Sequence, residues 1–289
     1  MSFTIVTDSS SNLTDQQIQE YGVSIRSLSF FVSGREYQSY VKGQHNDLKK
    51  FYDMMRQKET ITTSLIRLSE CRDLFETILK QGQDLLFIGF SSALSGTYQA
   101  AETVAGELRE EYPDRKIYTV DTLGASLGEG LLVHHAVQHQ KAGESIQEVY
   151  QWVLENRLHL AHWFTVDDLF FLKRGGRVSA TTALVGTLLG IKPVMHMDNE
   201  GRLIPVGKVR GRRTSLDALF DRMKETAIHP EQQTVFISHG DCIEDAEYLA
   251  SRIRKELHVK EILIHYVDPV IGAHSGPGTV ALFFLASHR

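Results

Sequence analysis

The hydroxyl-rich turn at residues 91–97 is the part of the chain best suited to binding chemistry. It follows an apolar run, Leu85–Phe90, that predicts a buried parallel strand, and it precedes a predicted helix. The first N–H groups of a helix lack intrahelical partners and the helix dipole is positive there, so this turn could hold an anion. The same sequence is also typical of an ordinary helix start capped by Ser92 or Ser95.

Two further polar segments could join this turn in one site. Residues 7–12 follow the predicted strand Phe3–Val6, at the carboxyl end where open α/β sheets bind ligands. Residues 271–278 contain four Gly or Pro residues among eight, which indicates an unusual backbone that leaves the imidazole of His274 at the end of a strand. Either segment could instead be a plain turn, in which Asp8 only caps the backbone and His274 is incidental.

A basic cluster surrounds Arg210. Lys208, Arg210, Arg212 and Arg213 lie close together and lead into a predicted helix, Arg210–Lys224. Cations at a helix N-terminus oppose the helix dipole, so their placement indicates an anionic partner. The same residues could instead form a helix start whose basic side chains are only exposed to solvent.

The composition narrows the class of protein. The chain has 289 residues and 42% hydrophobic content, enough for a substantial core in one large or two modest domains. A net charge of −5 argues against nucleic acid binding. We see neither a signal peptide nor an apolar run of the roughly 20 residues needed to span a bilayer. We therefore expect a cytoplasmic protein that does not insert into membranes.

Several common sites are disfavoured by the motifs. The sequence contains no Walker A pattern and no G-x-G-x-x-G, so nucleotide and dinucleotide sites are disfavoured. No G-x-S-x-G elbow surrounds Ser95. Cys71 and Cys242 have no second Cys nearby, and the histidines near His134 have no carboxylate partner in a metal motif. We therefore expect neither a metal nor a cofactor.

The order of predicted elements indicates an α/β protein. Strands alternate with helices up to about residue 160, which predicts a parallel sheet in this half. A second α/β set follows, so we predict domains at 1–160 and 161–289, with residues about 60–80 able to cross over between them. The remaining segments that matter below are a strand at Val23–Val32, a polar link at Ile61–Ser64 and an apolar helix at Ala180–Leu189. Thr14 and Gln17 also fit a capping box at the start of a helix.

Five motifs together resemble the DegV family. They are TDSS at residues 7–10, SSALSGTYQAA at 91–101, FTVDDLFFLKRGGRVS at 164–179, GIKPV at 190–194 and IGAHSGPGTVALFF at 271–284. The resemblance runs from the first predicted strand to the last. It implies a bacterial protein with an EDD-like parallel-sheet domain, a second α/β domain and a ligand buried between them. It also implies a lipid carrier, not an enzyme, that holds a long-chain fatty acid for a fatty acid kinase to phosphorylate.

The resemblance implies roles for individual residues where they match the family's motifs. The family's Thr-Ser-x-Pro-Ser motif matches Thr63 and Ser64, while its proline and last serine are absent here. An acidic residue that the family often has near residues 38–40 is also absent. The residues that we expect to bind the fatty acid carboxylate are Thr63, Ser64, Ser92, Ser95, Gly96 and His274. Arg210 matches an arginine linked to the kinase, and Arg174 and Arg177 of the glycine-hinged loop are further candidates for that contact.

The acyl chain needs a dry channel, for which the apolar segment Ala180–Ile191 is suited, although it could equally be plain core. The channel residues that we predict are Leu184, Leu188, Ile191 and Phe283. We expect a monomer, with no membrane insertion beyond a transient contact. Two other functions stay open: a serine hydrolase that uses Ser95 and His274 on a lipid ester, and a binder of a phosphorylated small molecule such as a sugar phosphate or nucleotide.

Overall fold

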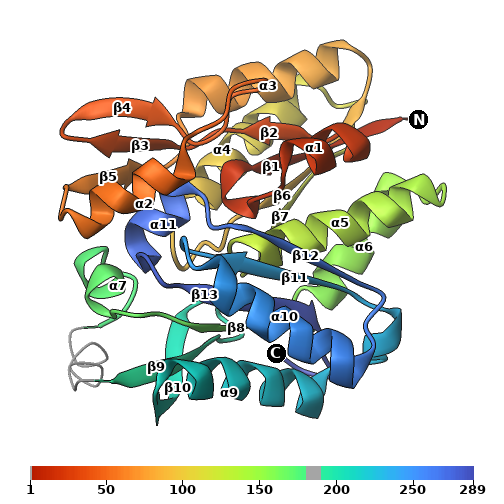
Figure 1. Ribbon diagram of the computed structural model, residues 1–289. Coiled ribbons are helices and arrows are strands. Elements are labelled where there is room, and N and C mark those ends of the chain that lie inside the picture. The colour runs from red at the N-terminus through yellow and green to blue at the C-terminus, as the bar shows by residue number, and fades with distance from the viewer. Residues whose placement is uncertain (1, 180–189) are drawn as a thin grey trace.

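A parallel four-stranded sheet forms the core of the N-terminal half (Figure 1). The structure is a computed structural model that describes residues 2–179 and 190–289. The strand order is β2-β1-β6-β7, with all neighbours parallel, as the sequence predicts. The strands are β1 (Phe3–Asp8), β2 (Ser24–Arg26), β6 (Asp84–Gly89) and β7 (Ile117–Asp121).

Helices cover both faces of this sheet because its central strands are apolar on both sides. In β6, Leu85 and Phe87 belong to the core shared with α3 and α4, whereas Leu86 and Ile88 belong to the core shared with α5. This alternation follows from the two-residue period of a strand. The helices of this half are α1 (Asp15–Tyr21), α3 (Leu68–Lys80), α4 (Thr97–Glu111), α5 (Leu127–Lys141) and α6 (Ile146–Asn156).

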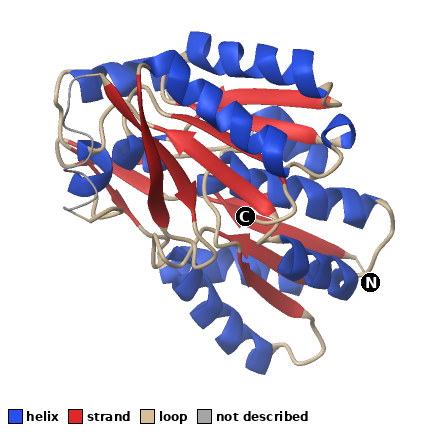
Figure 2. Cartoon of the chain, turned by 90° about the horizontal axis from the view of Figure 1, so that it is seen from below, coloured by secondary structure: helices blue, strands red, loops and turns tan. Residues whose placement is uncertain are grey.

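A six-stranded mixed sheet forms the second half (Figure 2). Its order is β10-β9-β8-β13-β11-β12, and only β11 and β12 are parallel among these described strands. The strands are β8 (Leu160–Thr165), β9 (Ile191–Met197), β10 (Leu203–Arg210), β11 (Thr234–His239), β12 (Glu261–Tyr266) and β13 (Val280–Leu285). Helices α9 (Arg212–Thr226) and α10 (Ile243–Leu257) share one core with this sheet.

Helix α5 lies between the two larger sheets. Its residues Leu131 and Val133 belong to one core together with Ile88 of the parallel sheet and Phe236 and Phe283 of the mixed sheet. The two halves are therefore joined by a continuous apolar core along this helix. The domain boundary at residue 160 and the crossover at residues 60–80 stay predictions.

A third, antiparallel sheet of order β4-β3-β5 lies beside the parallel sheet and contacts the C-terminal part of the chain. Tyr52 is fully buried there and donates a hydrogen bond to Val267 O at 2.9 Å. This bond and the packing of Val270 and Ala273 fix helix α11 against the N-terminal half. The elements are β3 (Ser29–Val32), β4 (Arg35–Gln38), β5 (Ile61–Ser64), α2 (Leu48–Arg56), α7 (Phe170–Arg174), α11 (Pro269–Ser275) and the short 3-10 turns η1 (Ser9–Ser11) and η2 (Pro230–Gln232).

Two predictions for the N-terminal half are wrong. The strand predicted at Val23–Val32 is two strands in different sheets, because the chain turns at Leu28, whose buried N–H donates to Ser9 Oγ at 3.0 Å. The polar link predicted at Ile61–Ser64 is strand β5, since it pairs with β3. By contrast, the capping box predicted for Thr14 and Gln17 is confirmed, with both of its hydrogen bonds formed.

Two further predictions for the C-terminal half are wrong. Most of the glycine-rich loop at 271–278 belongs to helix α11, because Asp268 caps it by accepting from Ile271 N at 2.9 Å and Pro269 suits its first turn. The helix predicted at Arg210–Lys224 begins at Arg212, and Arg210 is the last residue of β10. The helix predicted at Ala180–Leu189 lies outside the described residues.

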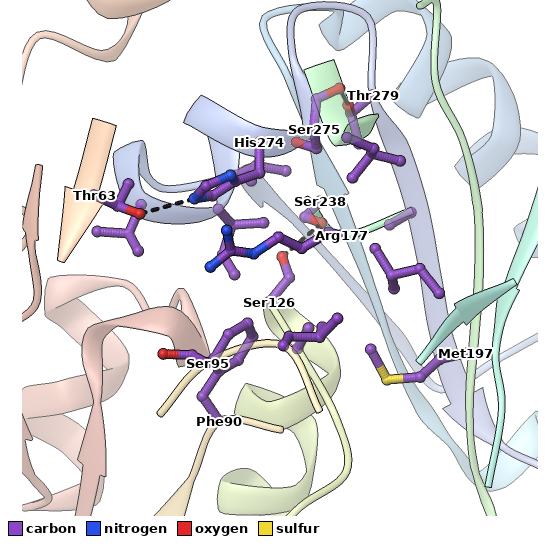
Figure 3. A pocket seen from close by; sticks show the side chains of 18 of the residues that line it. Thr63, Phe90, Ser95, Ser126, Arg177, Met197, Ser238, His274, Ser275 and Thr279 are labelled. Atoms are coloured by element: carbon purple, nitrogen blue, oxygen red, sulfur yellow. Dashed lines mark hydrogen bonds between the residues drawn. The ribbon is translucent and has the colours of Figure 1, made fainter. Parts of the chain in front are cut away.

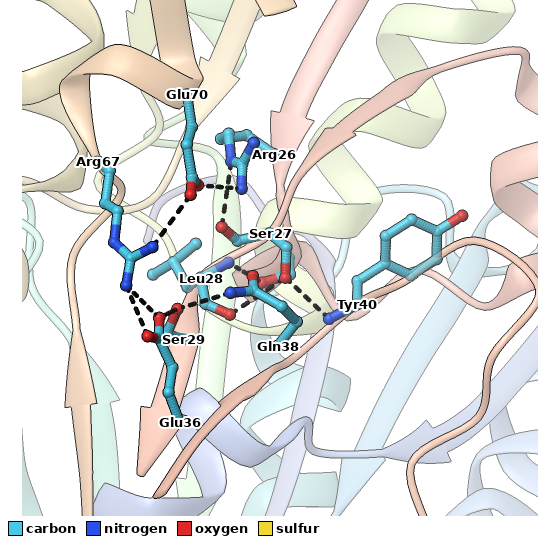
Figure 4. A network of polar contacts seen from close by, with 10 residues as sticks. Arg26, Ser27, Leu28, Ser29, Glu36, Gln38, Tyr40, Arg67 and Glu70 are labelled. Atoms are coloured by element: carbon cyan, nitrogen blue, oxygen red, sulfur yellow. Dashed lines mark hydrogen bonds and ion pairs between the residues drawn. The ribbon is translucent and has the colours of Figure 1, made fainter.

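A polar network stabilises the segment that leads from β5 into α3 (Figure 4). Arg67 donates to Glu36 Oε1 at 2.5 Å and to Glu70 Oε1 at 3.2 Å, and Arg26 donates to Glu70 Oε2 at 2.5 Å. Ile66 beside it is buried. These contacts fix the segment that follows the strand carrying Thr63.

Candidate ligand-binding site

A cavity of about 470 Å³ lies where the three sheets meet. Its volume falls within the roughly 300–1,000 Å³ typical of small-molecule sites. The walls come from β5, the turn before α4, the start of α5, helix α11 and five strands of the mixed sheet, β8, β9, β10, β11 and β13. The lining residues are Leu28, Thr63, Ser64, Leu65, Phe90, Leu94, Ser95, Gly96, Ala125, Ser126, His162, Phe164, Leu172, Arg177, Met197, Leu203, Ser238, Val267, Val270, Ile271, His274, Ser275, Thr279, Ala281 and Phe283.

Thr63 and His274 meet at one side of this cavity (Figure 3). Their Oγ1 and Nε2 atoms are 2.8 Å apart, although the residues are 211 positions apart in the chain. Strand β5 carries Thr63, and the last turn of α11 carries His274. Ser64 also lines the cavity. The structure thus brings together three of the residues predicted to bind a carboxylate.

The His274 imidazole is neutral near pH 7. Burial, together with the positive charges of Arg177 and Arg174, lowers its pKa to about 4. Among the described residues, its Nδ1 atom has no hydrogen-bond partner. The backbone of Gly175 packs directly against this atom, since a Cβ at Gly175 would lie 2.1 Å from Nδ1. The ring position therefore requires glycine at this point of the loop.

Ser95 and Gly96 supply another part of the same wall, at the start of α4. Ser95 Oγ accepts from Thr97 N at 3.2 Å and lies 2.9 Å from Thr97 Oγ1. Ser95 lines the cavity, whereas the N-cap residue of α4 is Gly96 and no side chain caps it, so the predicted cap by Ser92 or Ser95 is wrong. Asp8 caps η1 by accepting from Ser10 N at 2.9 Å, as the plain-turn alternative expects, and it also accepts from Phe90 N at 3.0 Å.

Some predicted residues are not brought to the cavity. Ser92 is absent from its lining, and its N–H donates to Asp121 Oδ1 at 3.1 Å. Ile191, at the start of β9, is also outside the lining, whereas Phe283 is part of it. The predicted channel residues Leu184 and Leu188 lie outside the described residues.

Apolar side chains form most of the remaining wall. Phe90, Leu172, Met197, Leu203 and Phe283 are among them. One polar side chain within this part, His162, is fully paired and neutral, because Ala125 N donates to its Nε2 at 3.2 Å and its Nδ1 donates to Leu160 O at 2.9 Å. Burial also lowers the pKa of His162 well below its usual range.

The candidate partner arginines differ in their surroundings. Arg177 lines the cavity, donates to Gly175 O, and has its pKa lowered by burial. Arg174 is exposed, with its guanidinium carbon 5.1 Å from the centre of the Phe171 ring. Arg210 is exposed, and its side chain makes no hydrogen bond or ion pair with the described residues. Their predicted role in contacting a kinase stays a prediction.

The other arginines of this cluster have partners within the chain. Arg212 donates to Asp245 Oδ2 at 2.9 Å and to Gly278 O at 2.7 Å. Arg213 stacks over the Tyr248 ring at 3.8 Å from its centre. The argument from the helix dipole is therefore wrong for these two residues, because internal contacts account for their placement.

The geometry does not favour a hydrolase. Ser95 Oγ bonds to Thr97 and His274 bonds to Thr63, so the two residues form no serine–histidine pair. No described carboxylate orients the free Nδ1 of His274, as a triad would need. Among residues 2–179 and 190–289, no group of three or more His, Cys, Asp or Glu side chains could hold a metal ion. In the same ranges, no helix has the length and apolar character needed to cross a bilayer.

Sequence reasoning missed four buried hydroxyls in the wall, those of Ser126, Ser238, Ser275 and Thr279. Ser126 precedes α5 and Ser238 lies within β11, so both have the appearance of ordinary cap and strand residues. Ser275 directly follows His274 in the sequence, and this position was the only indication that Ser275 lies in the site. Their common location depends on strand order in the mixed sheet, which the sequence does not reveal.

Comparisons with known proteins agree with this architecture. A sequence model described as "Uncharacterised protein, DegV family" matches residues 2–287. A DegV domain-containing protein of Clostridium perfringens is 44% identical over 99% of this chain and 98% of its own length. Another, from Streptococcus pyogenes, is 33% identical over 100% of this chain and 99% of its own.

Solved structures of similar proteins share the fold. A DegV family protein from Thermus thermophilus, described as binding fatty acid, superposes with a TM-score of 0.88 at 29% identity, covering 99% of this chain and 100% of that one. DegV from Bacillus subtilis, described as a fatty acid binding protein, gives a TM-score of 0.84 at 26% identity, with coverage of 99% and 100%. Both the sequence match and the fold cover the whole chain, and the protein therefore belongs to the DegV family.

Proposed function

We propose that this protein binds one long-chain fatty acid in the cavity, with the carboxylate at the side of Thr63, Ser95 and His274. The observation that carries this proposal is the distribution of lining groups: hydroxyl, imidazole and helix-start N–H groups gather on one side, and apolar side chains form most of the rest. Several solved relatives, including those from Thermus thermophilus and Bacillus subtilis, are described as fatty acid binders. A carboxylate with an alkyl chain is complementary to both parts.

The donors suit an ionised carboxylate. The Thr63 and Ser95 hydroxyls donate to the anion, and Ser95 lies at the positive end of the α4 dipole. Arg177 lines the same cavity and its positive charge acts on His274, so it also attracts the carboxylate. Burial of the alkyl chain supplies the main driving force, at about 0.8 kcal/mol per methylene.

We further propose that the protein is a carrier that presents this carboxylate to a fatty acid kinase for acyl phosphate formation. The carrier works as a cytoplasmic monomer and performs no chemistry itself. Support comes from the exposed β5–α3 turn at the carboxylate side, where Leu65 is 48% exposed, and from the free, exposed Arg210. A kinase transfers phosphate through a highly anionic state, for which an arginine without an internal partner is suited.

Substituting Ser95→Ala is expected to weaken fatty acid binding by about 30-fold. The reason is that a hydrogen bond to a charged acceptor contributes about 1.5–3 kcal/mol. The measurement is titration of delipidated protein with a fluorescent long-chain fatty acid. Ser251→Ala serves as the matched control, because Ser251 is exposed on α10 and bonds only to Tyr248 O. Equal affinity of Ser95→Ala and the parent would remove Ser95 from the site.

A further inference from the structure

Two serine hydroxyls in the cavity wall belong to one hydrogen-bonded chain. Ser126 Oγ donates to Asn12 Oδ1 at 2.6 Å, and it lies 3.0 Å from Ser238 Oγ. Ser126 and Ser238 are 5% and 0% exposed, and both line the cavity. Because the Ser126 proton is used toward Asn12, the Ser238 hydroxyl donates to Ser126. Ser238 Oγ therefore keeps lone pairs that accept from no described group.

Ser126 is held in an unfavourable conformation at this position. Its φ of 58° lies in the left-handed region, which is costly for a residue other than glycine. It occupies the N-cap position of α5, yet its side chain makes no capping hydrogen bond. A serine at this position normally stabilises the helix start through that bond. The chain therefore forgoes a cap and bears backbone strain, while the hydroxyl is directed to Asn12 and Ser238.

Ser275 adds an unused donor to the same wall. Its side chain is 6% exposed, it lines the cavity, and its Oγ has no hydrogen-bond partner among the described residues. A buried hydroxyl without a partner is unfavourable unless a ligand or water satisfies it. In the view of Figure 3, Ser275 lies next to His274 and Thr279, and Ser238 lies between Ser275 and Ser126. The cavity thus offers one free acceptor, Ser238 Oγ, and one free donor, Ser275 Oγ, in addition to the groups of Thr63, Ser95 and His274.

We propose that the cavity is built for a fatty acid that carries a hydroxyl group along its chain. The ligand hydroxyl donates to Ser238 Oγ and accepts from Ser275 Oγ, so one group satisfies both free positions. A keto or ether oxygen could only accept, and a plain methylene could satisfy neither. This inference rests on the proposed function, since it needs the carboxylate to be held at Thr63, Ser95 and His274.

The experiment compares three ligands of equal chain length: stearate, hydroxystearate with a mid-chain hydroxyl, and oxostearate with a mid-chain keto group. Affinities are measured by calorimetry on delipidated protein. Two hydrogen bonds of ordinary strength predict that hydroxystearate binds about tenfold more tightly than stearate. Oxostearate should fall between the two, because it can use only the Ser275 donor. Among positional isomers of hydroxystearate, the affinity should be highest when the hydroxyl is at an interior position of the chain and not next to the carboxylate.

Two variants separate the donor from the acceptor. Ser275→Ala should abolish the higher affinity of oxostearate relative to stearate, and it should reduce the higher affinity of hydroxystearate relative to stearate. Ser238→Ala should reduce the advantage of hydroxystearate and leave that of oxostearate unchanged. In each variant the affinities for hydroxystearate and oxostearate are compared with that for stearate on the same protein, so that a general effect on the cavity cancels. Ser251→Ala on α10 should match the parent for all three ligands.

The outcomes distinguish this inference from the proposed function. If stearate and hydroxystearate bind with equal affinity, the serines bind water or have only a structural role in the cavity wall. The inference is then wrong, while fatty acid binding is unaffected. If the serine variants weaken stearate as much as hydroxystearate, these residues act on the carboxylate or on folding, and the inference is again wrong. If none of the three ligands binds, the proposed function itself fails.

Discussion

Replacing Arg210 by alanine is expected to leave fatty acid binding unchanged and to lower acyl phosphate formation by a cognate fatty acid kinase by about 100-fold. Arg210 is exposed at the end of β10, and its side chain has no hydrogen-bond or ion-pair partner among the described residues. Its removal therefore leaves no buried group unpaired. Its neighbours Arg212 and Arg213 are held by Asp245 and Tyr248, so they cannot easily substitute for it.

The test needs both assays on one preparation: fatty acid titration and kinase-dependent acyl phosphate formation. Arg72→Ala is the matched control, because Arg72 pairs with Glu107 and Glu111 on the α3–α4 surface, and exposed ion pairs contribute little to stability. Thermal melting checks the fold of both variants. If Arg210→Ala supports phosphorylation at the parent rate, Arg210 belongs to a solvated surface and the proposed kinase contact is wrong.

Substituting Gly175→Ala is expected to weaken fatty acid binding by about 100-fold. The added Cβ would lie 2.1 Å from His274 Nδ1, a distance that no packing allows, so the imidazole must move. Movement of the ring breaks its 2.8 Å contact with Thr63 Oγ1 and disturbs both groups at the carboxylate. Loss of one charge-assisted hydrogen bond and weakening of a second account for a change of this size.

Gly106→Ala is the control for this substitution, because Gly106 lies within α4 and a Cβ there has nothing within 4 Å. Alanine should stabilise that helix by about 1 kcal/mol and leave binding unchanged. The double variant Gly175→Ala, His274→Ala provides a second check. If the collision with the ring is the cause, Gly175→Ala should have little further effect once the ring is removed. A full additional loss in the double variant would show that Gly175 acts through the loop and not through His274.

Local patterns predicted the parallel sheet and the start of α1 well, because both depend on short-range features. The alternation of apolar residues in β6 and the capping box at Thr14 and Gln17 are of this kind. The strand predicted at Val23–Val32 failed because Leu28 turns out of the sheet to meet Ser9, a contact between distant parts of the chain. The pairing of β5 with β3 was not predicted for the same reason.

The site was only partly predictable. Thr63, Ser95 and His274 were found through motifs, and the structure brings all three to one cavity. Ser126 and Ser238 were missed because each resembles a common cap or strand residue in isolation. Arg212 could not be assigned from charge pattern alone, since its partner Asp245 lies on a different helix.

Extraction and mass analysis of ligand from the purified protein tests the central proposal most directly. The account predicts one long-chain fatty acid per protein chain, released on denaturation and replaced when delipidated protein is incubated with added fatty acid. Oxygenated species should be enriched over their share in the host's lipids if the hydroxyl inference also holds. Protein that is reproducibly empty, and that does not take up added fatty acid, would contradict the proposed function.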